Sequence, residues 1–132
     1  MLDGLSHIGI AVRDLEEALG VYRDILGLDV TEIKELPGRG LKVAILDSGN
    51  TNVELLEGIS PDSAISRFID KRGPGIHHLC FKVSNIDRSL ENLSGAGIRL
   101  IDKKARAGAE GKPVAFLHPS SAKGVLIELE QE

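Results

Sequence analysis

The chain has 132 residues, of which 42% are hydrophobic and 27% charged, as expected for one globular domain. A net charge of −4 argues against non-specific nucleic-acid binding, which needs a basic field, and a single cysteine excludes an intrachain disulfide. The sequence has no apolar run of the ~20 residues that a membrane span needs and no recognisable signal peptide. We therefore expect a soluble, cytoplasmic protein.

The first half of the sequence predicts one strand, one helix and three more strands. Alternation of Ile8, Ile10 and Val12 predicts a strand over residues 6–12. Asp14 is the predicted helix cap, with Glu17 as its capping-box partner, and Gly27 ends the helix. The apolar residues at helical spacing are Leu15, Ala18, Leu19, Tyr22 and Ile25. The three further strands are predicted over residues 28–34, 41–47 and 52–57.

The next segment predicts a short helix that starts at Pro61 and closes at Gly73, which we interpret as a linker. The second half then repeats the pattern of the first. A strand over residues 76–83 precedes a helix capped by Asn85. Strands follow over residues 98–103, 113–118 and 124–130.

The two halves also align residue by residue. At an offset of 71 residues, His7 lies over His78 and Asp14 over Asn85. At an offset of 74, Glu54 lies over Glu128, so a loop is three residues longer in the second half. We predict an α+β fold of two tandem βαβββ modules in a single domain, residues 1–132. Module one covers about 5–57, the linker helix about 58–75 and module two about 76–132.

The alternation of side chains along each strand indicates a metal site. His7, Glu54, His78 and Glu128 all fall on the face of their strand that points away from the helix. If the two modules face each other, these side chains form an N₂O₂ site suited to a divalent ion. A single histidine on a strand is more often a hydrogen-bonded core residue, and a single strand-end glutamate more often a solvated one. The matched positions in both modules favour the metal site.

Three further residues receive structural interpretations. His77 lies on the opposite face of its strand and is expected beside the helix or behind the site. His118 precedes Pro119 at a strand end, where a loop position near the site and a structural role are equally open. Cys80 shares the face of His78 and is interpreted as a packed thiol.

Several segments together resemble a known superfamily. The paired strands H-I-G-I-A-V and H-H-L-C-F-K-V, with N-V-E-L-L-E and V-L-I-E-L-E, resemble the vicinal-oxygen-chelate superfamily of glyoxalases, dioxygenases and epimerases. Within it, G-I-H-H and F-L-H-P-S-S-A-K-G-V-L-I-E-L are similar to the methylmalonyl-CoA epimerase family. The resemblance implies a half-open eight-stranded barrel around one divalent ion, a homodimer and interconversion of (R)- and (S)-methylmalonyl-CoA. The implied ligands are His7, Glu54, His78 and Glu128, with the ion being Co, Mn, Ni, Zn or Mg.

The implied reaction removes a proton from C2 and passes through a metal-stabilised enolate. Some relatives carry a glutamate on the third strand as a proposed base, where this chain has Val43. The candidate bases are therefore Glu54 and Glu128, with a hydroxide on the ion as the alternative. Cations that could meet the phosphates of coenzyme A are Lys103, Lys104, Arg106, Lys112 and Lys123.

Two other functions on the same fold stay open. A glyoxalase I-type enzyme would use the same site on a glutathione hemithioacetal. A non-catalytic binding protein for small molecules would need aromatic walls, and the chain has only one tyrosine, three phenylalanines and no tryptophan.

Overall fold

The structure is a computed structural model that describes residues 1–132. The first seven elements are β1 (Leu5–Val12), α1 (Leu15–Leu19), η1 (Gly20–Ile25), β2 (Asp29–Leu36), η2 (Pro37–Arg39), β3 (Leu41–Asp47) and β4 (Asn52–Gly58). They are followed by α2 (Ala64–Arg72), β5 (Gly75–Val83), α3 (Ile86–Gly95), β6 (Arg106–Ala107), β7 (Pro113–Leu117), η3 (Pro119–Ala122) and β8 (Ile127–Gln131). The order βαβββ thus occurs twice, which confirms the predicted α+β class and its two modules.

The chain forms two compact units. The N-terminal unit comprises His7–His77, and the C-terminal unit comprises Met1–Ser6 with His78–Glu132. None of the helices is both long and apolar enough to span a membrane.

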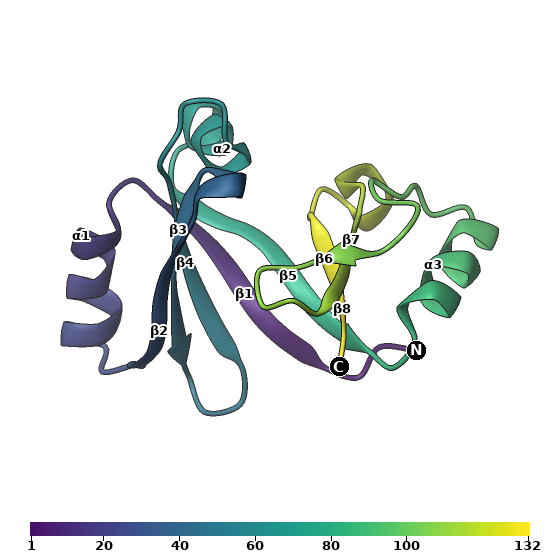
Figure 1. Cartoon of the computed structure of the whole chain (residues 1–132), viewed down its shortest axis with the longest axis horizontal. Coiled ribbons are helices and arrows are strands. Elements are labelled where there is room, and N and C mark those ends of the chain that lie inside the picture. The colour runs from purple at the N-terminus through teal and green to yellow at the C-terminus, as the bar shows by residue number, and fades with distance from the viewer. The chain divides into compact units, whose positions relative to one another are not determined.

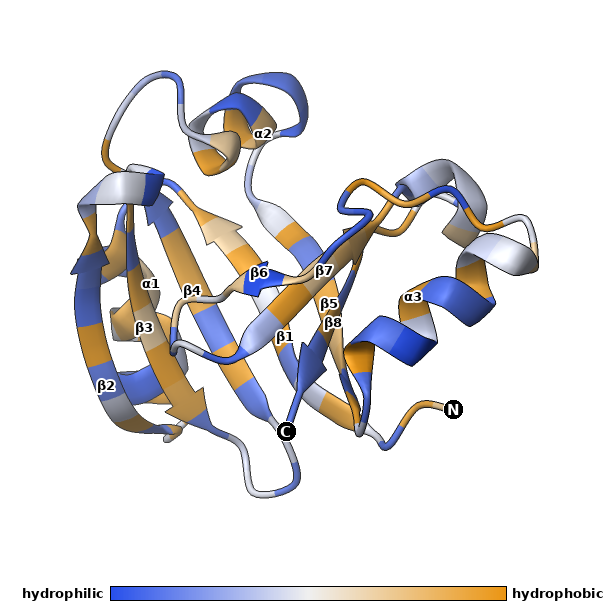
Figure 2. Ribbon diagram, turned by 45° about the vertical axis from the view of Figure 1, so that its right-hand side comes forward, coloured by the Kyte–Doolittle hydropathy of each residue, from blue (hydrophilic) through white to orange (hydrophobic).

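The N-terminal unit has a four-stranded sheet in the order β2-β3-β4-β1 (Figure 1). β1 and β4 run parallel, and the other neighbours run antiparallel. Figure 2 shows the hydrophobic and hydrophilic bands that alternate along these strands. On one face, α1 packs with the strands in a core that contains Val12, Leu15, Leu19, Ala44, Leu46 and Leu55.

Helix α2 covers part of the other face of this sheet. Its Ile65 is buried against Ala11, Val43 and Leu56. Ala11 and His7 have the same parity on β1, so α2 covers the Ala11 end of the face that carries His7. Val43, only 2% exposed, lies within this apolar cluster.

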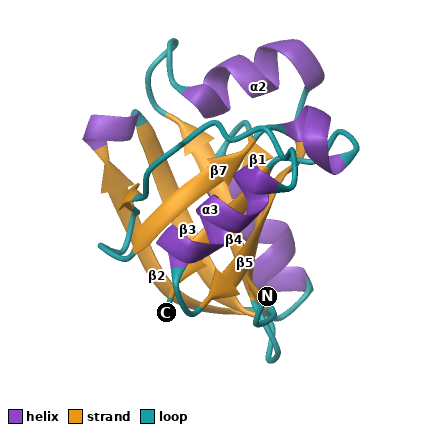
Figure 3. Cartoon of the chain, turned by 90° about the vertical axis from the view of Figure 1, so that its right-hand side faces the viewer, coloured by secondary structure: helices purple, strands orange, loops and turns teal.

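The C-terminal unit has the strand order β5-β8-β7-β6 and the same parallel pairing between its first two neighbours. Helix α3 lies against β7 and β8 (Figure 3). The core between them contains Val83, Ile86, Leu90, Ala115, Leu117 and Leu129.

Helices α1 and α3 begin with the same pair of contacts. Asp14 accepts a hydrogen bond from the Glu17 amide at 3.0 Å, and Asn85 accepts one from the Arg88 amide at 3.0 Å. In addition, Glu57 of β4 accepts from the Leu15 amide at 2.6 Å. Its equivalent, Gln131 of β8, accepts from the Ile86 amide at 2.9 Å. Each helix is therefore tied at its start to the strand that carries a candidate ligand.

The apolar stripe of the first helix was predicted one turn too long. After Leu19 the chain continues as the π-helix η1, in which the Leu26 amide donates to the Val21 carbonyl. A π-turn holds more residues than an α-turn, so spacing based on 3.6 residues loses its register there. Ile25, predicted to be buried, is 77% exposed. Gly27 does end the segment, with a φ of +79°.

The strand predicted over residues 98–103 does not form. Leu100 makes a single bridge to Leu117, and the Asp102 carboxylate accepts from the Phe116 amide at 2.9 Å. A side chain thus takes the bond that a strand carbonyl would accept, and the short strand β6 pairs with β7 instead.

The linker helix also begins later than predicted. Its cap is Ser63, whose hydroxyl accepts from the Ser66 amide at 3.1 Å, rather than Pro61.

Candidate functional site

His7 and Glu54 form a buried pair on the N-terminal unit. In the parallel pairing of β1 with β4, Gly9 stands opposite Glu54, and His7 lies two residues earlier on the same face. His7 Nδ1 is 3.1 Å from Glu54 Oε2. The His7 side chain is 7% exposed and that of Glu54 14%.

His78 and Glu128 form the corresponding pair on the C-terminal unit. Here Cys80 stands opposite Glu128 in the parallel pairing of β5 with β8. His78 Nε2 is 3.2 Å from Glu128 Oε1, and both side chains are buried. The structure therefore brings each predicted histidine next to the predicted glutamate of its own module.

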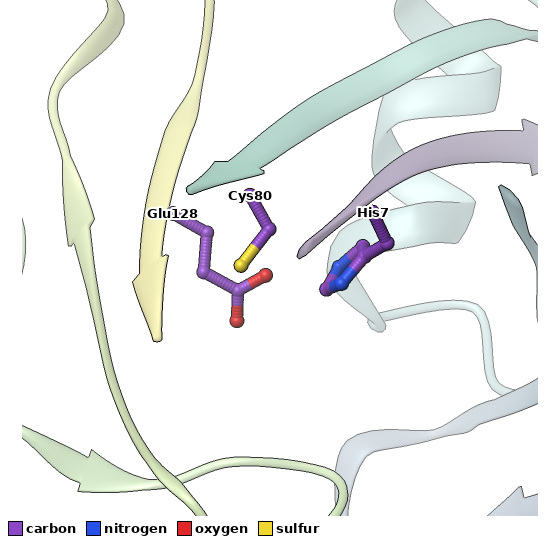
Figure 4. A group of neighbouring side chains, drawn as sticks. All are labelled: His7, Cys80 and Glu128. Atoms are coloured by element: carbon purple, nitrogen blue, oxygen red, sulfur yellow. The ribbon is translucent and has the colours of Figure 1, made fainter. Parts of the chain in front are cut away.

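Cys80, interpreted from the sequence as a packed thiol, is buried and is a neighbour of Glu128. Figure 4 shows Cys80 on β5 and Glu128 on β8, and also draws His7 of β1. The thiol sulfur and a Glu128 carboxylate oxygen lie within 4.8 Å. Burial raises the pKa of the Cys80 thiol strongly, and the nearby charges of Glu128 and Glu130 raise it further. The thiol is therefore protonated at neutral pH and is a hydrogen-bond donor toward Glu128.

Phe116 joins the face that carries His78 and Glu128. It stands opposite Glu128 in the pairing of β7 with β8, and the rings of Phe116 and His78 meet edge to face at 5.9 Å between centroids. The guanidinium of Arg106 lies 5.6 Å from the centre of the Phe116 ring. Sequence reasoning missed the contacts of Phe116 with His78 and Arg106. Strand parity places Phe116 on the same face as Glu128 only once the register between their strands is known.

The other two histidines have structural surroundings. His77 meets Phe68 of the linker helix α2 edge to face at 5.0 Å between ring centroids, whereas its strand parity predicted a position beside the helix of module two or behind the site. His118 caps η3, where its Nδ1 accepts from the Ser120 amide at 3.1 Å. Accepting this bond requires the tautomer that carries its proton on Nε2.

The geometry of each pair suits a divalent cation. Two adjacent ligands of an octahedral ion, each about 2.1 Å from the metal, lie about 3.0 Å apart. The nitrogen–oxygen separations of 3.1 Å and 3.2 Å match that spacing. Imidazole nitrogens with carboxylate oxygens are a donor set that suits Zn, Co, Ni and Mn. The two atoms of each pair are therefore close enough to be neighbouring ligands of one ion, and the same separation is that of a hydrogen bond.

Comparison with known proteins places the chain in a family. A family model described as the glyoxalase/bleomycin resistance protein/dioxygenase superfamily matches residues 6–116. A relative from Mus musculus, named methylmalonyl-CoA epimerase, mitochondrial, is 45% identical over 131 residues, which cover 98% of this chain and 74% of the relative. The chain belongs to this superfamily and, within it, to the methylmalonyl-CoA epimerase family.

Solved structures of the family share the fold. Methylmalonyl-CoA epimerase from Mycobacterium tuberculosis is 37% identical, with a TM-score of 0.91 over 98% of this chain and 88% of the other. A second methylmalonyl-CoA epimerase, solved in complex with methylmalonyl-CoA and NH₄⁺, is 32% identical, with a TM-score of 0.91 over 100% and 96% of the two chains.

Proposed function

We propose that this protein interconverts (R)- and (S)-methylmalonyl-CoA. The observation that carries the proposal is the repeat of one buried His–Glu pair at equivalent positions of both modules. Membership of a family whose named members are methylmalonyl-CoA epimerases supports this choice of reaction and an acyl-CoA substrate.

In this proposal His7, Glu54, His78 and Glu128 together hold one divalent ion. When bound, the ion supplies positive charge that stabilises the oxyanion of the enolate. Each histidine also fixes the orientation of the glutamate beside it. A buried carboxylate with such a partner has a defined direction in which its remaining lone pairs point.

Inversion at C2 needs one group that takes a proton and a second that returns one to the opposite face. We assign these roles to Glu54 and Glu128, one from each module. One carboxylate accepts the C2 proton, and the other, in its protonated form, donates a proton from the other side. The two glutamates exchange roles when the opposite epimer reacts. Val43 takes no part, because it is an apolar side chain inside the α2 cluster.

The further features of the proposal are a homodimer and a cytoplasmic location.

The direct test is conversion of enantiomerically pure (R)-methylmalonyl-CoA, followed by chiral analysis of the product. The proposal predicts approach to a mixture of both epimers. The glutathione hemithioacetal of methylglyoxal is assayed in parallel. Turnover of that compound without epimerisation would assign the site to a glyoxalase I-type reaction instead.

A further inference from the structure

We propose that Arg106 binds the free carboxylate of the acyl group and so selects thioesters that carry an acid group at C2. The inference rests on the proposed epimerase function and adds a specificity-determining residue to it. It concerns residues of the C-terminal unit alone.

Two contacts bring Arg106 to the face of the proposed ligands. Its guanidinium lies over the Phe116 ring, and the same ring meets His78 edge to face. Only one aromatic ring therefore separates the cation from an imidazole of the His–Glu pair. A guanidinium over an aromatic face is held by cation–π attraction as well as by packing.

Asp102 fixes the direction of the guanidinium. Its Oδ1 is 3.3 Å from Arg106 Nε, while its Oδ2 accepts from the Phe116 amide at 2.9 Å. One carboxylate thus positions both the cation and the strand that carries the ring beneath it. Because Asp102 contacts Nε, the contact leaves the two terminal nitrogens of Arg106 to form the fork that matches a second carboxylate.

Other basic residues of this segment have different surroundings. Lys103 and Lys104 line a pocket of about 540 Å³ beside α3, together with Leu90, Glu91 and Leu100. This pocket lies on the helix side of the sheet, whereas Phe116 and His78 belong to the other face. Lys103 and Lys104 are therefore matched controls that carry the same charge but face the opposite side.

The acyl carboxylate suits this position better than the phosphates of coenzyme A do. The carboxylate is attached to C2, the carbon whose proton the site removes. The phosphates are separated from the thioester by the whole pantetheine arm. With C2 at the His78–Glu128 pair, as the proposed function requires, a cation one ring away from His78 would be close to the first group and far from the second.

The test measures whether the contribution of Arg106 to binding affinity requires the carboxylate of the ligand. Binding of methylmalonyl-CoA and of propionyl-CoA, which lacks the carboxylate, is compared by calorimetry for the wild type, Arg106→Gln, Arg106→Lys and Lys104→Gln. Because Arg106→Gln removes a charge-assisted fork, it should lower the affinity for methylmalonyl-CoA by roughly tenfold to a hundredfold more than the affinity for propionyl-CoA. Arg106→Lys keeps the charge without the fork and should lose part of this preference. Lys104→Gln should keep all of it.

Methylmalonyl-pantetheine, which has no phosphates, separates the two anionic parts of the substrate. Arg106→Gln should lower the affinity for this compound as much as it lowers the affinity for methylmalonyl-CoA. An equal effect on methylmalonyl-CoA and propionyl-CoA, with none on the pantetheine compound, would assign Arg106 to the phosphates and overturn the proposal. No effect on any ligand would also overturn it and leave Arg106 a structural role. Failure of the wild type to bind or epimerise methylmalonyl-CoA would instead reject the proposed function. Arg106→Lys carries the test if Arg106→Gln does not fold.

Discussion

At the scale of single residues, the proposed metal site depends on two histidines that occupy equivalent places in a duplication. His7 and His78 are both buried, and each lies within hydrogen-bonding distance of a glutamate on the neighbouring strand. Their positions could be predicted because strand parity and the internal repeat are both readable from one sequence. The contacts of Cys80, Arg106 and Phe116 could not, because they depend on the register between strands that are distant in the sequence.

Replacement of either histidine should remove the ion. We expect His7→Ala and His78→Ala each to lower the bound metal from stoichiometric to trace amounts. The three ligands that remain in each variant would bind the ion more weakly than the full set of four. His77→Ala is the control, because His77 packs against Phe68. Elemental analysis of dialysed protein provides the measurement. A stoichiometric ion in the double variant His7→Ala/His78→Ala would show that the site lies elsewhere.

The two glutamates should respond differently from the histidines when they are replaced by glutamine. Glutamine retains a carbonyl oxygen that can ligate, but it does not accept a proton as a carboxylate does. We expect Glu128→Gln to keep most of its metal and to lose at least ~10²-fold in epimerisation, the usual cost of removing a general base. Glu54→Gln should also lose epimerisation, because it removes the carboxylate that the proposal assigns to the other face of C2.

Deuterium incorporation from solvent shows which of the two proton-transfer groups each variant has lost. A variant that still exchanges the C2 proton of one epimer but not of the other has lost the group on one face. Near wild-type turnover by both glutamine variants with metal bound would mean that neither carboxylate is the base.

At the scale of elements, helices α1 and α3 each begin with a hydrogen bond to the strand that carries a candidate ligand. Glu57 lies three residues after Glu54 on β4, and Gln131 lies three residues after Glu128 on β8. The two helix starts, most strand positions and the order of elements were predictable because caps and hydrophobic periods are local signals. The π-turn at Gly20 and the Asp102–Phe116 bond were not, because neither follows from local spacing.

The contact between Glu57 and the start of α1 should contribute measurably to stability. Glu57→Ala leaves the Leu15 amide without this acceptor and should cost about 1–2 kcal/mol of unfolding free energy. For a chain of this size, that loss lowers Tm by roughly 3–8 °C. Glu57→Gln places in module one the residue type that module two uses at Gln131, so its Tm should stay near the wild-type value. Equal losses in both variants would show that the charge of Glu57, rather than its acceptor oxygen, matters.

At the scale of the whole molecule, we predict a homodimer. Val21 and Ile25 of η1 are 46% and 77% exposed, Leu26 directly after it is 61% exposed, and β2 is an edge strand of its unit. Exposed apolar groups and free strand edges are surfaces that association covers. Sedimentation at micromolar concentration should show a dimer, and Ile25→Glu should shift it toward monomer. A monomeric wild type under these conditions would contradict the prediction.

The central claim is that this fold uses a bound divalent ion to remove the proton at C2 of methylmalonyl-CoA. Proton NMR in D₂O follows that proton directly, with the protein as purified, after treatment with a chelator and after return of a divalent metal. We predict fast exchange of the C2 proton for deuterium, its loss on chelation and its recovery with metal. Exchange that persists undiminished after complete removal of metal would contradict the account, as would the absence of exchange in the metal-loaded protein.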